Sequence, residues 1–140
     1  MFHDGINIIL DIYDPLKTDF PFEDEQIYTN GEGFLIIYDV TKKYMLKTIT
    51  KEIENIHKFK KVNDFPIVVV GNKIDLEDQR EITFDEGKEL VSKYPRVLFF
   101  ESSAKENINV DDVFHALVGE IYEDKKSLLQ PEEKKECLMM

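Results

Sequence analysis

The sequence predicts an α/β fold with a mainly parallel sheet flanked by helices. Short runs rich in Ile, Val, Leu and Phe alternate with segments whose apolar residues recur every three or four positions. The strand-like runs are continuously apolar, which is typical of parallel strands buried on both faces. A length of 140 residues, with 42% hydrophobic and 34% charged content, suits one globular domain with its own core.

Four apolar runs are the predicted strands. The run at 6–14 follows Asp4-Gly5, a dipeptide that favours a hairpin turn. The others lie at 34–40, 66–71 and 97–101. Because helical segments separate these three runs, we expect them to lie parallel in one sheet.

Helical periodicity fills the segments between and after these runs. One stripe predicts a helix that buries a single face, at Leu46, Ile49, Ile53 and Ile56. Thr83 and Glu86 form a capping-box pattern ahead of 87–93. Apolar residues share a face over 110–122, with Asn109 as the expected N-cap. The acidic cluster at 23–25 is expected to begin another helix, where negative charge is favoured.

The domain is predicted to span 1–124, followed by a flexible charged tail over 125–140 that contains Pro131. The net charge of -11 argues against nucleic-acid binding, because such a surface repels phosphates. The longest apolar run is too short to span a bilayer, and the N-terminus lacks a signal-peptide pattern. With a single cysteine, these features predict a cytoplasmic protein.

Two neighbouring predicted strands end in polar residues suited to ligand binding. Asn72-Lys73-Ile74-Asp75 follows the third run, and Ser103-Ala104-Lys105 follows the fourth. In open α/β sheets, ligands bind beyond the carboxyl ends of the strands. We therefore expect these two loops to form one site. Taken alone, each pattern also fits a surface turn with a solvated lysine.

Placed in this order, the two loops resemble the Ras branch of small GTPases, whose guanine-specificity motifs are Asn-Lys-x-Asp and Ser-Ala-Lys. Further likeness lies at 10–14 and 29–35, so the resemblance covers nearly the whole chain. It implies a Ras-like P-loop GTPase fold, GTP or GDP with Mg²⁺ as cofactors, and signalling effectors or regulators as partners.

The chemistry of guanine explains the residue types. Its ring N–H and exocyclic amine are adjacent donors, which one carboxylate, Asp75, can accept together. The resemblance implies that Asn72 contacts the base and ties the loops together, and that the stem of Lys73 covers the base plane. It also implies that the Ala104 N–H binds the guanine carbonyl, while Ser103 and Lys105 shape their loop.

The phosphate-binding half of such a site has no counterpart in the sequence. None of the six glycines begins the Gly-rich loop ending in Gly-Lys-Ser/Thr that cradles phosphates. By the resemblance, Met1 falls in the second strand, so the first strand, the P-loop, the first helix and the switch I threonine would precede it. We therefore expect an incomplete domain with weak or lost nucleotide binding.

The Mg²⁺-linked region is altered as well. Asp14 matches the aspartate that the resemblance links to Mg²⁺, but Lys17 stands in place of the next motif glycine. Thr18, or another residue of this shortened loop, stands where a catalytic glutamine is expected, and Pro15 removes a backbone donor. These changes predict a pseudo-GTPase without useful GTP hydrolysis.

The predicted strands at 6–14 and 34–40 would lack the central strand that separates them in the family. Their backbone groups must pair with each other, find another strand, or remain unpaired. We expect a marginal fold that is prone to self-association.

The sequence ends in a tetrapeptide, Cys137-Leu138-Met139-Met140, that fits the C-a-a-X box, where terminal Met favours farnesylation. A chance cysteine near the end is the alternative. One prenyl chain gives only reversible membrane binding. Because acidic neighbours offset the nearby lysines, we expect weak association with the cytoplasmic membrane face.

Three functions stay open from the sequence. The first is a lipid-anchored, Ras-like signalling protein with guanine recognition and little or no catalysis. The second is a working GTP-binding switch with slow hydrolysis, whose phosphate ligands come from a longer transcript or a second chain. The third is a decayed or incomplete gene product.

Overall fold

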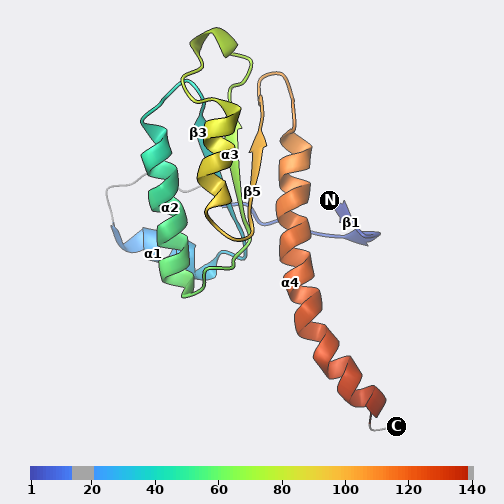
Figure 1. Cartoon of the computed structure of the whole chain (residues 1–140). Coiled ribbons are helices and arrows are strands. Elements are labelled where there is room, and N and C mark those ends of the chain that lie inside the picture. The colour runs from blue at the N-terminus through green and yellow to red at the C-terminus, as the bar shows by residue number, and fades with distance from the viewer. Residues whose placement is uncertain (14–20, 139–140) are drawn as a thin grey trace.

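The computed structural model describes residues 1–13 and 21–138, with side chains for 1–13 and 25–127. Its centre is a parallel three-stranded sheet in the order β3-β4-β5. The strands are β3 (Phe34–Asp39), β4 (Ile67–Asn72) and β5 (Val97–Glu101). Helices α2 (Met45–Lys60) and α3 (Phe84–Ser92) cover one face, and α4 (Val110–Leu138) covers the other (Figure 1). The predicted α/β architecture is confirmed.

Strand β4 is buried on both faces, as its continuous apolar sequence predicts. Ile67 and Val69 belong to the core under α2 and α3, whereas Val68 and Val70 pack toward Val113 and Leu117 of α4. The four β4 side chains are each at most 2% exposed. Two hydrophobic layers therefore hold the central strand rigidly between its neighbours.

Local sequence signals account for the two helices on the first face. The α2 stripe buries Ile49, Ile53 and Ile56, and Leu46 packs at its edge. The capping box of α3 is formed in both directions: Glu86 N–H donates to Thr83 Oγ1 at 3.1 Å, and Thr83 N–H donates to the Glu86 carboxylate at 2.9 Å. These reciprocal bonds satisfy two of the free N–H groups at the helix start. A short 3-10 turn, η1 (Glu77–Gln79), links β4 toward α3.

The N-terminal segment forms a hairpin and not the predicted long strand. Strands β1 (Phe2–His3) and β2 (Ile6–Asn7) pair antiparallel around Asp4-Gly5, where φ is 50° and 76°. The predicted turn is confirmed, but the predicted strand over 6–14 is wrong in extent, because regular pairing stops at Asn7. Beyond it, Ile8 still pairs with Met1, since its N–H donates to Met1 O at 2.7 Å. A strand needs a neighbour for its backbone groups, and none of the described strands pairs with 9–13. Ile9 is consequently 92% exposed.

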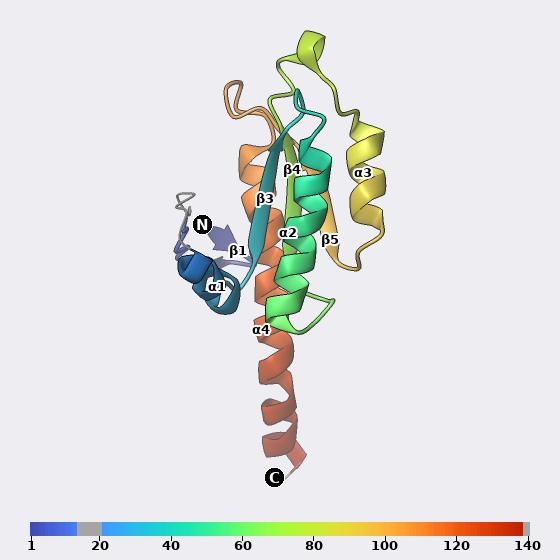
Figure 2. The same cartoon turned by 90° about the vertical axis from the view of Figure 1, so that its left-hand side faces the viewer.

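Strand β3 is an edge of the sheet among the described strands, because it pairs with β4 on one side only. One expected outcome was that the segments 6–14 and 34–40 pair with each other. The described residues show no such pairing. Ile37 is 56% exposed on this edge strand. Figure 2 shows β3 lying at the margin of the sheet, with the N-terminal hairpin beyond it.

Helix α1 (Pro21–Asn30) and the C-terminal part of α4 complete the described chain. The acidic cluster at 23–25 falls within α1, as expected. Helix α4 continues through Leu138, where the sequence analysis expected a flexible tail after Asp124. The Lys, Glu, Leu and Gln residues of 125–138 favour a helix, whereas Pro131 within it disfavours one. The helix extends beyond the rest of the molecule in Figure 1.

Candidate functional site

The candidate site lies where the three parallel strands end. Strand β4 ends at Asn72 and its loop begins at Lys73, and the loop after β5 begins at Ser102. Two backbone bonds join these loops beyond the strands: Ser102 N–H donates to Gly71 O at 2.8 Å, and Ile74 N–H donates to Ser102 O at 3.2 Å. The structure thus brings the two predicted motifs side by side.

The side chain of Asn72 bridges the two loops. Its Oδ1 accepts from Ser102 Oγ and from the Ala104 N–H, both at 3.1 Å. With the oxygen held by two donors, the amide nitrogen points away from them, and it has no partner among the described residues. This nitrogen is available to donate to an acceptor on a ligand.

The carboxylate of Asp75 is held by a buried hydroxyl. Ser103 is 0% exposed, and its Oγ donates to Asp75 Oδ1 at 2.7 Å. The same Oγ accepts from the Glu106 N–H at 3.1 Å, which directs the hydroxyl proton toward Asp75. Within the described part of the chain, no donor reaches the second oxygen of Asp75. An oriented carboxylate with free acceptor capacity fits the two adjacent donors of guanine.

Lys73 reaches in the opposite direction, toward β3. Its backbone is left-handed, with φ of 71°, and its Nζ donates to Asp39 Oδ2 at 2.7 Å. Burial opposes ionisation of Asp39, but hydrogen bonds from Lys73 and Thr41 outweigh it and lower the pKa of that carboxyl to about 2. The hydrogen bond to Asp39 raises the pKa of Lys73. The lysine is charged and anchored although its side chain is 50% exposed.

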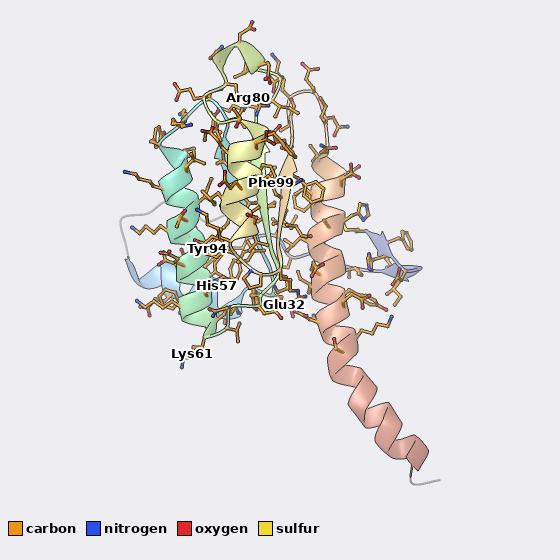
Figure 3. All side chains as sticks on the ribbon, viewed as in Figure 1. Glu32, His57, Lys61, Arg80, Tyr94 and Phe99 are labelled. Carbon is orange, nitrogen blue, oxygen red and sulfur yellow. The ribbon has the colours of Figure 1, made fainter. Side chains whose placement is uncertain are left out.

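An ion pair supports the start of the second loop. Arg80 Nη1 and Nη2 donate to the two oxygens of Glu101 at 2.6 and 3.2 Å, and both side chains are mostly buried. The hydrogen bond to Glu101 raises the pKa of Arg80. Figure 3 shows Arg80 near the end of the sheet where the loops meet. Asn109 Nδ2 donates to Glu101 O at 2.8 Å, so the residue before Ser102 is held on both its side chain and its carbonyl.

Comparison with known proteins identifies the family. The sequence profile of the Ras family matches residues 1–123. The chain belongs to the Ras family. It is 43% identical over 124 residues to Ras-like protein rasB of Dictyostelium discoideum, covering 88% of this chain and 61% of that protein. Identity is 40% over 114 residues to Ras-like protein 2 of Mucor circinelloides f. lusitanicus, covering 81% and 57%. It is 38% over 128 residues to Ras-like protein RAS2 of Hydra vulgaris, covering 91% and 66%.

The chain therefore spans 57% to 66% of the length of these three relatives. Ras-family proteins in general bind GTP or GDP with Mg²⁺ and act through effectors and regulators. Each of the six residues expected to recognise guanine in this chain is in the described part of the structure: Asn72, Lys73, Asp75, Ser103, Ala104 and Lys105.

The Ala104 N–H, which the Ras resemblance assigns to the guanine carbonyl, already has an acceptor within the protein. It donates to Asn72 Oδ1. A guanine carbonyl would have to share this N–H with Asn72. Lys105 is exposed. Ser103 and Ile108 exchange two backbone hydrogen bonds, which close the loop that contains Ala104 and Lys105.

Three residues that support the site were not predicted from the sequence: Asp39, Arg80 and Glu101. Asp39 ends a parallel strand, so the rule that predicted Asn72 and Ser103 also applies to it. Asn109 was expected to cap the last helix with its side chain. Its carbonyl does accept from the Val113 N–H at 3.1 Å, but its φ is 59° and its side chain donates to Glu101 O instead.

The remaining predicted site residues fall elsewhere. Asp14, with Pro15, Lys17 and Thr18, lies outside the described residues, and so does any Mg²⁺ position built on it. Cys137 lies near the end of α4, and its side chain is not among those described. One group of possible metal ligands in the described part lies on the hairpin and α4, remote from the loops: His3, Asp4 and Glu123, with ligand atoms within 4.8 Å.

Proposed function

We propose that this Ras-family chain recognises the guanine base of a nucleotide, holds the nucleotide weakly and does not hydrolyse GTP usefully. The Ser103-to-Asp75 hydrogen bond is the observation that carries the proposal. It orients a carboxylate whose second oxygen is open to the guanine ring N–H and exocyclic amine. Adenine lacks this donor pair, so selectivity follows from Asp75. The Asn72 nitrogen donates to the base, and the Lys73 stem covers its plane.

The proposed affinity is low because the base supplies few contacts. Two hydrogen bonds to a charged group contribute about 1.5–3 kcal/mol each. Association costs at least ~4 kcal/mol in lost translational and rotational freedom. The balance is at most about 2 kcal/mol, and the Asn72 hydrogen bond adds about 0.5–1.5 kcal/mol. The Kd is therefore a few millimolar or weaker. A phosphate cradle supplies the additional energy in a GTPase, and these 140 residues contain no such motif.

A working switch is the second candidate. The relatives that match are longer than this chain, which covers 57% to 66% of three of them. If a phosphate-binding segment is supplied by a longer chain, the same base site would belong to a GTP-dependent switch with slow hydrolysis. A decayed or incomplete gene product would have neither activity.

We also propose prenylation of Cys137 in the C-a-a-X box, and weak, reversible association with the cytoplasmic face of a membrane. Within the described residues, no helix combines the length and apolar character needed to cross a bilayer. Incorporation of a radiolabelled farnesyl group tests the modification, with Cys137→Ser as the control. A wild-type chain that takes up no label would remove this part of the proposal.

A calorimetric titration with GDP and Mg²⁺ tests base recognition, with ADP as the competing nucleotide and Asp75→Ala as the control variant. We expect guanine-selective binding with a Kd of a few millimolar or weaker, which Asp75→Ala abolishes. Micromolar binding would favour the working switch. No binding by protein shown to be folded would contradict guanine recognition and favour a decayed product.

A further inference from the structure

Asp39 connects strand β3 to the base-recognition loop that follows β4. It is the last residue of β3 and lies in register with Asn72 at the end of β4. Its side chain is 12% exposed, and its Oδ2 accepts from Lys73 Nζ at 2.7 Å. The other oxygen accepts from the Thr41 N–H at 2.9 Å and from Thr41 Oγ at 2.6 Å. Thr41 therefore fixes the carboxylate on the side that Lys73 does not use.

The geometry separates the two charged members of the recognition motif. Lys73 extends from the β4 loop toward β3, because its ammonium is bound to Asp39. Asp75 extends toward the β5 loop, because its carboxylate is bound to Ser103. The sheet order β3-β4-β5 places these anchors on opposite sides of β4. The lysine stem is consequently held away from the carboxylate that would accept the base.

A half-exposed lysine without this anchor would sample many rotamers. Its ammonium would also be free to turn toward Asp75, two residues along the same loop, and compete with the donors of a base. Ordering a rotamer-rich side chain on binding costs affinity, about two- to tenfold for one side chain. An anchor formed before binding removes that cost.

We infer that Asp39 is a positioning residue for guanine recognition: it anchors the Lys73 ammonium so that the lysine stem is ordered beside the base site and Asp75 stays open. Asp39 lies outside the Asn-Lys-x-Asp motif and does not contact the base itself. The inference rests on the proposed function, since it assigns a role within the same site.

The test is a double-mutant cycle. Asp39→Asn keeps the shape and one acceptor oxygen for Thr41 but removes the charge that holds Lys73. Lys73→Met keeps the apolar stem and removes the ammonium. Affinity for GMP, with AMP as the control, is measured from ¹⁵N–¹H chemical shifts, which report binding in the millimolar range. We expect Asp39→Asn to weaken GMP binding about two- to tenfold. In the Lys73→Met background we expect no further loss, because Asp39 acts through the ammonium.

A matched control removes another lysine–carboxylate pair. Lys43 pairs with Glu86 between the β3–α2 loop and α3, and Lys43→Met should leave GMP affinity unchanged. Equal affinity of Asp39→Asn and wild type, or losses that add in the double variant, would overturn the role of Asp39 and leave the proposed function intact. A folded wild type with no preference for GMP over AMP would overturn both. If Asp39→Asn does not fold, Asp39→Glu replaces it, since it shifts the carboxylate by one methylene. GMP affinity is then measured in the same double-mutant cycle with Lys73→Met.

Discussion

Removal of the Arg80 guanidinium should destabilise the domain through the residue that precedes the second recognition loop. Arg80 donates to both oxygens of Glu101 at 2.6 and 3.2 Å and to Ile82 O at 3.1 Å. The side chains of Arg80 and Glu101 are only 14% and 12% exposed. Arg80→Met would leave the Glu101 charge mostly buried without its cation, which is the more damaging way to break an ion pair.

The magnitude follows from this burial. Breaking a fully buried pair by removing one partner costs about 3–5 kcal/mol. Since a fraction of each side chain here reaches solvent, we expect about 2–4 kcal/mol for Arg80→Met. For a domain of this size, that corresponds to a fall in Tm of roughly 6–20 °C. Part of the loss should be local, because Glu101 leads directly into Ser102 and Ser103.

Urea unfolding and thermal melting measure the loss, and Glu77→Gln is the matched control. Glu77 also accepts from Arg80, at 2.9 Å, but its side chain is 68% exposed. An exposed partner contributes little, so this control should lose less than about 0.5 kcal/mol. If Arg80→Met unfolds within about 0.5 kcal/mol of the wild type, the pair does not support the loop as argued.

Three other measurements test separate parts of the structure. A Cβ on Gly87 would lie 2.5 Å from Tyr38 Oη and 2.6 Å from Phe99 Cζ, so Gly87→Ala should lower the free energy of unfolding by about 1–3 kcal/mol; unchanged urea unfolding would contradict this packing. The Asp39 carboxyl has a pKa of about 2 in the folded protein, below its ordinary 3.8, so its contribution to stability is complete above the ordinary value and is lost as the pH falls toward 2. The difference in free energy of unfolding between the wild type and Asp39→Asn should therefore shrink as the pH falls over that acid range. A difference that stays constant with pH would contradict the lowered pKa of Asp39. Strand β3 should promote self-association through the backbone groups that no described strand pairs. Ile37→Lys should therefore reduce the sedimentation-derived mass at high concentration, and a wild type that stays monomeric at every concentration would refute it.

The sequence was sufficient for elements whose signals are local. The stripe through Ile49, Ile53 and Ile56, the reciprocal Thr83–Glu86 cap and the Asp4-Gly5 turn each depend on residues within a few positions. The two recognition loops could be placed together because the carboxyl ends of parallel strands share one edge. These features required no knowledge of the rest of the chain.

Features that depend on distant partners could not be predicted in the same way. Apolar residues favour a strand over 9–13, but a strand forms only where another strand accepts its backbone bonds, and none of those described does so. The Asp39 and Lys73 pair spans 34 positions, and the Arg80 and Glu101 pair spans 21. The first pair follows from the register of β3 and β4, and the second joins the segment after η1 to the end of β5; composition and periodicity leave both open.

Among the described residues, the bonds that hold the proposed base site join the three strands and their loops. Asn72 is held by Ser102 and Ala104, Asp75 by Ser103, and Lys73 by Asp39. Since none of these bonds involves a phosphate-binding segment, the selectivity of the site and the total affinity for a nucleotide have separate origins. Phosphate ligands supplied by any other segment should strengthen GDP and ADP alike and leave the ratio of their affinities unchanged. That ratio depends on the orientation of Asp75, which makes nucleotide preference a better test of this site than affinity alone.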